Sequence, residues 1–463
     1  MDYDYNDTIA AVSTAIGGGI GIIRLSGTEA LKIAKTLFKP GGAASKYMWK
    51  SHRVYYGHII KDDRILDECM LTIMKAPKSY TKEDVVEISF HGGVKSAELI
   101  LDAVLAEGAR LAEPGEFTKR AFLNGRIDLT KAQAVTDIIN SKTDLAHNQA
   151  LNRLSGRLFG SIAEIRGKLL DLMAEIEASI DYPEYDMEED NLKRALQTLN
   201  SIKMEIYELI ESGKMGIIIS EGLKTVILGR PNVGKSSLLN RMLGSERAIV
   251  TDIPGTTRDV LSESLNIRGI PINIMDTAGI RNTSDIVESI GVSKSFEQAY
   301  DADLLLYILD GSKEPDSEDL KNLKRLAEKK IILVINKIDL GSRMDLSELI
   351  ERLSCKEAFP AVEISATENK GIDKLYNAVY NMFFEGQISI ENTALISNAR
   401  DMASLKKALL HVEAAISSIE SGFTEDMTVI DIKDAYVYLG QIIGESLEDD
   451  IIDRIFSKFC LGK

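Results

Sequence analysis

A glycine-rich segment, residues 229–236, carries the residue types that bind phosphate. Its sequence, Gly229-Arg-Pro-Asn-Val-Gly-Lys-Ser236, matches the spacing G-x-x-x-x-G-K-S/T. The glycines let backbone N–H groups face phosphate oxygens, Lys235 can reach the terminal phosphates of a nucleotide, and the Ser236 hydroxyl can ligate Mg²⁺. An apolar run, residues 225–228, precedes the segment, and a helix-forming run follows it, so the phosphates would also lie at a helix N-terminus. The segment predicts a nucleoside triphosphate site.

Three further short motifs follow, each after an apolar run typical of a strand. They are Asp276-Thr277-Ala278-Gly279, Asn336-Lys337-Ile-Asp339 and Ser365-Ala366. The Asp276 carboxylate would lie near Mg²⁺, and the Gly279 N–H would lie where a γ-phosphate sits. The Asp339 carboxylate can accept both N–H groups on the Watson–Crick edge of guanine, which adenine cannot match. Because adenine cannot offer this pair of N–H groups, the Asp339 motif predicts GTP as the nucleotide. Ser365 and Ala366 would hold the base through backbone N–H groups.

A loop between the first two motifs adds hydroxyl groups that could meet Mg²⁺ and the γ-phosphate. It comprises Thr251, Asp252, Ile253, Pro254, Gly255, Thr256 and Thr257, of which Thr257 is the better Mg²⁺ candidate. With these residues, the predicted GTP site also includes Asn232, Val233, Gly234, Lys235, Ser236 and Ser237. The Asn232 side-chain oxygen suits a monovalent cation beside the phosphates, although an asparagine that stabilises the local turn is the competing interpretation. Ile280 occupies the position where Ras-like proteins carry a water-orienting glutamine, so water must be activated differently.

The pattern of apolar and turn residues changes along the chain and predicts a multidomain fold. Residues 1–118 alternate short apolar runs with turns and contain one helical segment, residues 29–38, which indicates an α+β domain. Residues 119–215 and 386–463 have apolar positions at helical spacing and predict one α-helical domain. Residues 216–385 alternate apolar strands with amphipathic helices, as an α/β P-loop (Ras-like) domain with a parallel sheet requires, and would be inserted between the two helical stretches.

The amino-acid composition disfavours several classes of protein function. The 463 residues include 55 Lys+Arg and 71 Asp+Glu, a net charge of −16, so the average surface should repel nucleic acid. The three cysteines, Cys69, Cys355 and Cys460, are far apart, which disfavours a disulfide framework or a structural zinc site. The acidic N-terminus and the lack of a long apolar run predict a cytoplasmic protein without membrane association.

Several blocks outside the nucleotide motifs make the chain resemble the MnmE (TrmE) family of tRNA modification GTPases over essentially its full length. The blocks are Asp7-Thr-Ile, the segment from Gly21 through Arg24 to Gly27, the segment 79–87, His91-Gly-Gly, the segment 114–129 and the terminal Phe459-Cys460-Leu-Gly-Lys463. The resemblance implies a folate-binding and dimerising N-terminal domain and a G domain inserted into a helical domain. It also implies that a flavin-dependent MnmG-type partner, carrying FAD, forms a heterotetramer or larger complex with the homodimer.

The resemblance further implies the reaction and its residues. An aminomethyl or carboxymethylaminomethyl group would be placed on C5 of the wobble uridine of certain tRNAs, with 5,10-methylene- or 5-formyl-tetrahydrofolate as the one-carbon source. Arg24, Glu87, Arg126 and Lys463 would contact the folate. Glu87 can accept paired N–H bonds from the pterin, whereas Arg and Lys suit the glutamyl carboxylates. Cys460 would be a redox or nucleophilic residue, or a thiol that merely lines the folate pocket.

In this family GTP hydrolysis depends on K⁺ and on contact between the G domains of a dimer. The resemblance therefore implies K⁺ ligands at Asn232, Thr251, Ile253 and Thr256, with Ser236 and Thr257 on Mg²⁺. One departure concerns the residue that positions the attacking water. The family often has a glutamate where this chain has Asn282, so Asp285 or Glu288 substitutes for it, or backbone and water fill the role.

The sequence leaves two alternative functions open. A ribosome-assembly or RNA-chaperone GTPase would share the G-domain motifs, but residues 386–463 carry more acids than bases, unlike a basic RNA-binding module. The second alternative is a GTP-dependent scaffold with a vestigial folate site.

The segment 110–131 has five basic residues and three acids. This excess predicts a small positively charged surface, and hence weak, salt-sensitive tRNA binding by this chain alone.

Overall fold

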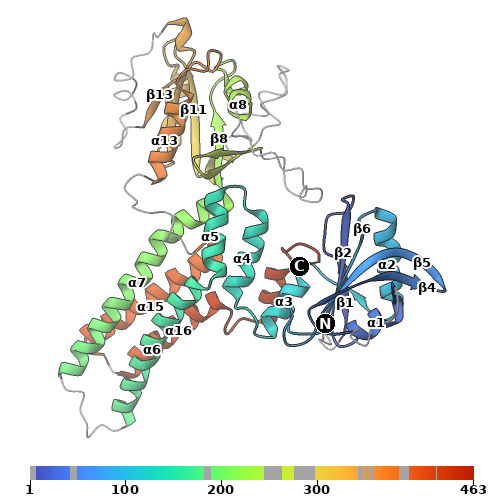
Figure 1. Ribbon diagram of the computed structural model, residues 1–463. Coiled ribbons are helices and arrows are strands. Elements are labelled where there is room, and N and C mark those ends of the chain that lie inside the picture. The colour runs from blue at the N-terminus through green and yellow to red at the C-terminus, as the bar shows by residue number, and fades with distance from the viewer. Residues whose placement is uncertain are drawn as a thin grey trace. The chain divides into compact units, whose positions relative to one another are not determined.

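The computed structural model describes residues 7–41, 49–181, 189–244, 263–275, 298–341, 349, 353, 359–384, 396–423 and 425–462 (Figure 1). The chain divides into two compact units. The first comprises Met1–Thr136, Leu154–Arg166 and Tyr436–Lys463, and the second comprises Asp137–Arg153 and Gly167–Ala435.

A seven-stranded sheet of order β3-β4-β5-β6-β2-β1-β7 forms the centre of the first unit. Its strands are β1 (Ile9–Val12), β2 (Ile20–Ser26), β3 (Phe38–Pro40), β4 (Arg53–Lys61), β5 (Arg64–Met74), β6 (Val85–His91) and β7 (Arg110–Leu111). All neighbours pair antiparallel except β1 and β7, which are parallel. Five of these strands, β1, β2, β4, β5 and β6, coincide to within one residue with the short apolar runs of the sequence at residues 9–12, 20–25, 54–60, 65–74 and 85–90.

Two helices pack on this sheet, α1 (Ala30–Leu37) and α2 (Val94–Ala106), and their buried residues share one core with the strands. The helix predicted at residues 29–38 corresponds to α1, whereas α2 was not predicted. The buried positions of α2 are Ala97, Ile100, Ala103 and Val104, so half of its apolar face is alanine. Alanine has the highest helix propensity but little hydrophobic contrast, which hides the helical period in the sequence.

Helices from the N-terminal and C-terminal parts of the chain pack together within the first unit. They are α3 (Glu116–Leu123), the start of α4 (Leu129–Asn140) and α17 (Asp449–Phe456). Phe456 and Phe459 pack with Leu129 and Ala132 in one buried cluster. Burying a side chain of this size contributes about 1.5–3 kcal/mol, so the C-terminal tail is part of the core of this unit.

A six-stranded sheet of order β13-β12-β11-β8-β10-β9 forms the centre of the second unit. Its strands are β8 (Leu223–Leu228), β9 (Glu263–Ile267), β10 (Ile270–Ile274), β11 (Leu304–Asp310), β12 (Ile331–Asn336) and β13 (Ala361–Glu363). All pairs are parallel except β9 with β10, an edge hairpin that the sequence analysis does not predict. The central strands β11 and β12 are almost entirely buried, as expected for a sheet covered on both faces.

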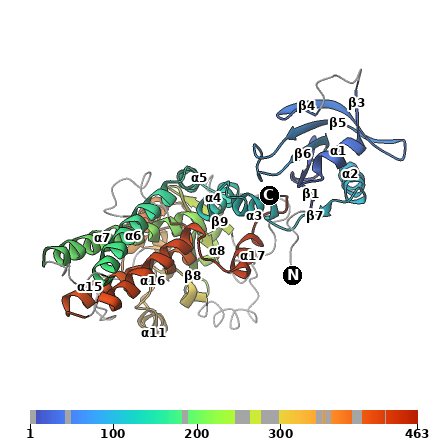
Figure 2. The same ribbon diagram turned by 90° about the horizontal axis from the view of Figure 1, so that it is seen from below.

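The helices of this unit comprise those beside the sheet and long ones that flank it in sequence. They are α5 (Asp144–Leu154), α6 (Arg157–Asp181), α7 (Glu189–Glu221), α8 (Lys235–Leu243), α11 (Ser317–Arg325), α13 (Ile372–Phe384), α15 (Ala399–Glu420) and α16 (Glu425–Ile443); α6 and α16 continue into segments of the first unit. Helices α7 and α15 lie side by side, although the whole sheet separates them in sequence (Figures 1 and 2). The α/β segment is therefore an insertion between two helices that pack together.

The segment between α4 and α5 contacts the edge hairpin. Lys142 Nζ donates to Ser264 Oγ at 2.9 Å, Ser264 Oγ donates to Asn273 Oδ1 at 2.8 Å, and Asn273 Nδ2 donates to the Glu221 carbonyl at 2.8 Å. Burial lowers the pKa of Lys142. Next to this chain of bonds, Leu145 packs on the hairpin turn.

The predicted fold class is confirmed: an α+β part, a helical part and an inserted α/β part with a glycine-rich phosphate loop. The residue boundaries of three domains stay predictions. Within the described ranges, no helix has the length and apolar character needed to cross a membrane.

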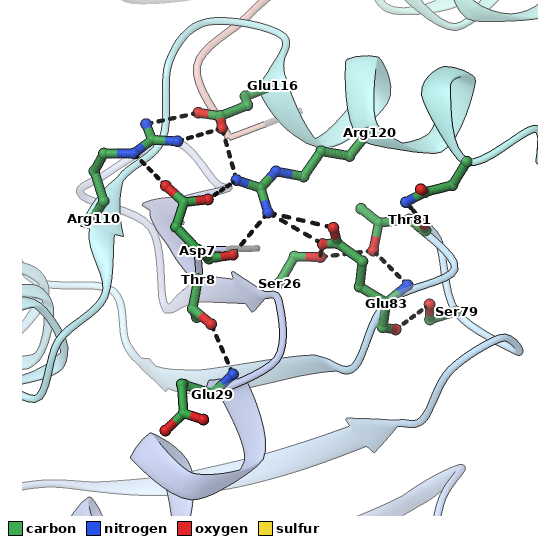
Figure 3. A network of polar contacts seen from close by, with 11 residues as sticks. Asp7, Thr8, Ser26, Glu29, Ser79, Thr81, Glu83, Arg110, Glu116 and Arg120 are labelled. Atoms are coloured by element: carbon green, nitrogen blue, oxygen red, sulfur yellow. Dashed lines mark hydrogen bonds and ion pairs between the residues drawn. The ribbon is translucent and has the colours of Figure 1, made fainter. Parts of the chain in front are cut away.

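A buried guanidinium, that of Arg120 on α3, connects its helix to the N-terminal segment and to the loop before β6 (Figure 3). The Arg120 side chain is 2% exposed and forms ion pairs with Asp7, with Glu116 at 3.0 Å and with Glu83 at 3.3 Å. Arg110 completes the network through Asp7 at 2.7 Å and Glu116 at 2.6 Å. Three carboxylates thus surround two guanidinium groups; Arg120 and Glu116 are buried, whereas Arg110, Asp7 and Glu83 are partly exposed.

Replacing Arg120 should destabilise the first unit strongly. Arg120→Met keeps the stem volume but leaves three carboxylates close together without their buried cation. We expect a loss of about 3 kcal/mol, the low end for a broken buried pair, since Asp7 and Glu83 are partly exposed. The fluorescence of Trp49, the only tryptophan, reports denaturant unfolding of this unit. The control Lys95→Met removes an exposed pair with Glu98 and should change stability by less than about 0.5 kcal/mol.

The pH dependence of this variant provides a second readout. Burial alone would raise the pKa of Asp7 and Glu116, but hydrogen bonds from Arg110 and Arg120 outweigh it and hold both pKa values below their ordinary range. The resulting stabilisation is complete above the unfolded-state pKa of about 4 and is lost as pH falls through the lower folded-state values. The native chain should therefore lose stability below about pH 4 more steeply than Arg120→Met. Parallel curves for the two proteins would contradict this assignment.

Candidate functional site

The glycine-rich loop lies between the end of β8 and the start of α8. Its backbone has positive φ at Gly229 (143°), Asn232 (64°) and Gly234 (102°), which bends the chain sharply between strand and helix. A Cβ on Gly234 would lie 2.1 Å from Asn336 Nδ2, so no larger residue fits there. Gly234 is also the N-cap of α8 and forms no side-chain cap, so the positive end of the helix dipole faces this loop.

The polar side chains of this loop follow the predicted pattern. Lys235 Nζ donates to the Gly229 carbonyl at 2.9 Å and to the Arg230 carbonyl at 2.8 Å, so the ammonium group lies over the loop. Ser236 and Ser237 occupy the first turn of α8. The left-handed backbone of Asn232 is what a turn-stabilising asparagine adopts, and its exposed side chain also remains compatible with the cation interpretation.

Asn336 connects three of the predicted motifs. Its side chain is buried, Nδ2 donates to the Val233 carbonyl at 2.9 Å, and Oδ1 accepts from the Ala366 N–H at 3.1 Å. The amide therefore holds the phosphate loop and the Ser365-Ala366 turn on either side of the end of β12. Asp339 follows in a short 3₁₀ helix, η1 (Ile338–Leu340), with its side chain exposed.

Lys337 extends the same connection on the other side. It has a left-handed backbone (φ 66°), and its Nζ donates to the Asn232 carbonyl at 2.6 Å and to Asp310 Oδ2 at 2.8 Å. Burial alone would raise the pKa of Asp310, but hydrogen bonds from Lys337 and Ser312 hold it below its usual value. Asp310 therefore remains an anion that fixes the lysine.

Sequence reasoning missed Asp310 and Arg241 as members of this site. Arg241 of α8 donates to the Ala366 carbonyl at 3.2 Å and to the Thr367 carbonyl at 3.1 Å. The signal for Asp310 was available, because it ends a strand as Asp276 and Asn336 do, and such polar residues gather at one edge of a parallel sheet. Arg241 gives no comparable signal, since an arginine on a short amphipathic helix is usually solvated.

Several predicted site residues lie outside the described residues. They are Thr251, Asp252, Ile253, Pro254, Gly255, Thr256, Thr257, Asp276, Thr277, Ala278, Gly279, Asn282, Asp285, Glu288 and Lys463. Their roles stay predictions, as do the K⁺ and Mg²⁺ ligand sets that include them.

A second cluster of predicted site residues lies in the first unit. Arg24 of β2 and Glu87 of β6 are directly opposite in the sheet, and Arg24 Nε lies 2.8 Å from Glu87 Oε1. The Arg24 guanidinium also donates to the Gly462 carbonyl at 3.3 Å. The guanidinium carbon of Arg126 lies 4.7 Å from the centroid of the Tyr80 ring, and that of Arg24 lies 5.8 Å from it. The structure thus brings together Arg24, Glu87, Arg126 and the residue before Lys463.

The two described thiols differ in environment. Cys69 is buried in the sheet, and burial raises its pKa to about 12, so it is a weak nucleophile. Cys460 is exposed, and its carbonyl accepts from the Gly115 N–H at 3.2 Å. The backbone of the tail is therefore anchored while the Cys460 side chain remains accessible.

The predicted positive island at residues 110–131 is wrong. Arg110 and Arg120 are neutralised by Asp7, Glu83 and Glu116. Lys119 pairs with Asp453, and Lys131 pairs with Asp128 at 3.5 Å. Most acids in this list are distant in sequence, so the local count of charges could not reveal them.

Comparisons with known proteins match both units. The model of the MnmE helical domain matches residues 129–460, and that of the GTP-binding protein TrmE N-terminus matches residues 8–126. The tRNA modification GTPase MnmE of Thermoanaerobacter pseudethanolicus is 48% identical over 460 residues, 99% of each chain. That of Bacillus subtilis is 45% identical over 461 residues, 99% of this chain and 100% of its own. The G domain of the T. maritima FeoB transporter is 26% identical over 34% of this chain and 97% of its own, with a TM-score of 0.25, too low to support an inference.

Asp339→Asn should change the preferred base. The substitution replaces a carboxylate that accepts two guanine N–H groups by an amide that can donate to the C2 oxygen of xanthine. We expect roughly a tenfold to hundredfold loss of affinity for GTP, and a gain for xanthosine triphosphate, since each hydrogen bond to a charged group contributes about 1.5–3 kcal/mol. Equilibrium binding of fluorescent analogues of both nucleotides measures the change. Asp301→Asn, at an exposed aspartate outside the motifs, is the control, and an unchanged preference for GTP would exclude this role.

Proposed function

The chain belongs to the MnmE family of tRNA modification GTPases, and from that membership we propose which chemistry its two sites perform. It is a GTP hydrolase that takes part in tRNA modification. In the proposal, it installs an aminomethyl or carboxymethylaminomethyl group on C5 of the wobble uridine of certain tRNAs. A folate supplies the one-carbon unit, and an MnmG-type flavoprotein partner supplies FAD. The observation that carries the proposal is the Arg24–Glu87 pair beside Arg126 and the C-terminal tail.

The phosphate loop supports the nucleotide half of the proposal. Lys235 exchanges its two carbonyl acceptors for phosphate oxygens, and the N–H groups at the start of α8 stabilise negative charge. The hydroxyls of Ser236 and Thr257 would hold Mg²⁺, which supplies charge neutralisation at the phosphates when it is bound. The buried Asn336 keeps the base side and the phosphate side of the site at a fixed separation.

A potassium ion is the second cation of the proposal. Asn232, Thr251, Ile253 and Thr256 offer only oxygen atoms, the donor type that hard monovalent cations take. Such an ion would neutralise charge that develops during phosphoryl transfer, as an arginine finger does elsewhere. A homodimer in which two G domains meet would complete the site, and Asn282, Asp285 or Glu288 would position the attacking water.

The cluster in the first unit supports the folate half. The Glu87 carboxylate suits the N–H groups of a pterin, and the Arg24 ion pair holds it in one orientation. Because Arg24 is engaged with Glu87, Arg126 and Lys463 are the better partners for the glutamyl carboxylates. Exposed Cys460 lies two residues before Gly462, which contacts Arg24, so a chemical role for its thiol stays part of the proposal.

The charge of the chain supports a shared role in holding tRNA. The net charge is −16, and the basic side chains of residues 110–131 are largely occupied by ion pairs. In the proposed complex, a homodimer of this chain with the flavoprotein in the cytoplasm, the partner makes most of the phosphate contacts.

Loss of this chain should remove the wobble modification. In a deletion strain, mass spectrometry of digested tRNA should show unmodified C5 at the wobble uridine. A plasmid with the native chain should restore the modification, whereas Lys235→Ala should not, because it removes the phosphate ligand. Unchanged C5 modification in the deletion strain would exclude the proposed role.

The cation proposal predicts faster GTP turnover in K⁺ than in Na⁺. We expect a difference of roughly tenfold or more at equal ionic strength, since removing one stabilising charge from a transition state has effects of that size or larger. Asn232→Ala should abolish the difference. If Asn232 only stabilises the turn, the variant keeps its K⁺ preference, and equal rates in both salts for the native chain would exclude the site altogether.

A further inference from the structure

The Tyr80 ring lies close to two cations of the proposed folate site. Its ring centroid is 5.8 Å from the Arg24 guanidinium carbon and 4.7 Å from that of Arg126. Arg24 lies on β2, whereas Arg126 follows α3, so Tyr80 is the side chain that both have in common. Arg24 also lies 5.6 Å from the buried Phe117 ring. An aromatic face attracts a guanidinium electrostatically, and the attraction grows where water is partly excluded.

The loop that carries Tyr80 is fixed from several sides. Tyr80 Oη lies 3.0 Å from Thr118 Oγ1 on α3. The Ser79 hydroxyl donates to the Glu83 carbonyl at 2.5 Å, and Asn124 Nδ2 donates to the Thr81 carbonyl at 2.7 Å. The ring therefore has a defined position before any ligand binds.

The same loop is attached to the buried network around Arg120 (Figure 3). Ser26 Oγ lies 2.6 Å from Thr81 Oγ1 and donates to Glu83 Oε2 at 2.6 Å. Glu83 in turn pairs with Arg120 at 3.3 Å. Thr81 and Glu83, which follow Tyr80, are thus held by the buried side chains of Ser26 and Arg120, whereas most surface loops lack such buried polar contacts.

We propose that Tyr80 is a positioning residue of the folate site, which holds Arg24 and Arg126 at a fixed spacing for the ligand. The inference rests on the proposed function and adds to it. Two guanidinium groups near one ring repel each other, and without the ring the exposed Arg126 side chain would lose the contact that holds it beside Arg24. The ring offsets this repulsion and removes side-chain freedom that ligand binding would otherwise have to restrict. Tyr80 acts through the arginines and takes no part in the transfer reaction.

Binding of 5-formyltetrahydrofolate to the full chain tests the proposal by calorimetric titration. Tyr80→Met and Tyr80→Leu, which remove the ring, should weaken binding roughly tenfold, equivalent to about 1.4 kcal/mol. Tyr80→Phe keeps the ring and should stay within about threefold of the native chain. Tyr56→Leu, at an exposed tyrosine of β4, is the matched control and should bind normally. The Trp49 unfolding transition shows which variants are folded.

A double-mutant cycle separates positioning from a general structural effect. If Tyr80 acts through Arg126, Tyr80→Met should weaken binding far less in an Arg126→Met background than in the native one. Equal effects in both backgrounds, or folded Tyr80→Met with native affinity, would overturn the inference. A large loss in Tyr80→Phe would also overturn it, even if the other variants do not fold. Failure of the native chain to bind the folate would instead overturn the proposed function.

Discussion

The buried guanidinium of Arg120 is the constraint on which the first unit depends. A charge that is 2% exposed is tolerated only with partners, and its partners come from the N-terminal segment, the loop before β6 and α3. Satisfying one cation therefore fixes the relative positions of segments that are remote in sequence. Tyr80 precedes Glu83 in the same loop and Arg126 follows α3, so the network fixes the segments next to these residues of the proposed folate site.

In the second unit, a neutral side chain holds together segments that are distant in sequence. Asn336 is buried at the end of β12, and its amide donates to the phosphate loop and accepts from the Ser365-Ala366 turn. An amide suits this position because it offers a donor and an acceptor at one point without the desolvation cost of a charge. Lys337 and Asp310 add an ion pair at the partly open rim, where water lowers that cost.

The sequence predicts the fold well where patterns are local and poorly where they are not. Strands β1, β2, β4, β5 and β6 and the P-loop follow from apolar runs and spacing, because period and turn chemistry are local properties. Helix α2 was missed since alanine carries half of its buried face. The prediction of a positive island was wrong for a different reason. Asp7 pairs with Arg110 and Arg120, and Asp453 pairs with Lys119. Both carboxylates are distant in sequence, so only the tertiary fold brings them near these cations. The motif predicted a role for Asn336, but its contacts with Val233 and Ala366 are formed only in the tertiary structure.

The contact between Lys142 and the edge hairpin limits how the chain can be divided for experiments. The hairpin belongs to the α/β segment, but the helical stretch before it contacts it at three places: Lys142 at Ser264, Leu145 at Gly269 and the Glu221 end of α7 at Asn273. A fragment cut at residue 216 would keep the end of α7 and every nucleotide motif but lack Lys142 and Leu145. Its hairpin would expose apolar surface and rehydrate Ser264. Nucleotide affinities measured on such a fragment would describe an edge of the sheet that the intact chain does not have.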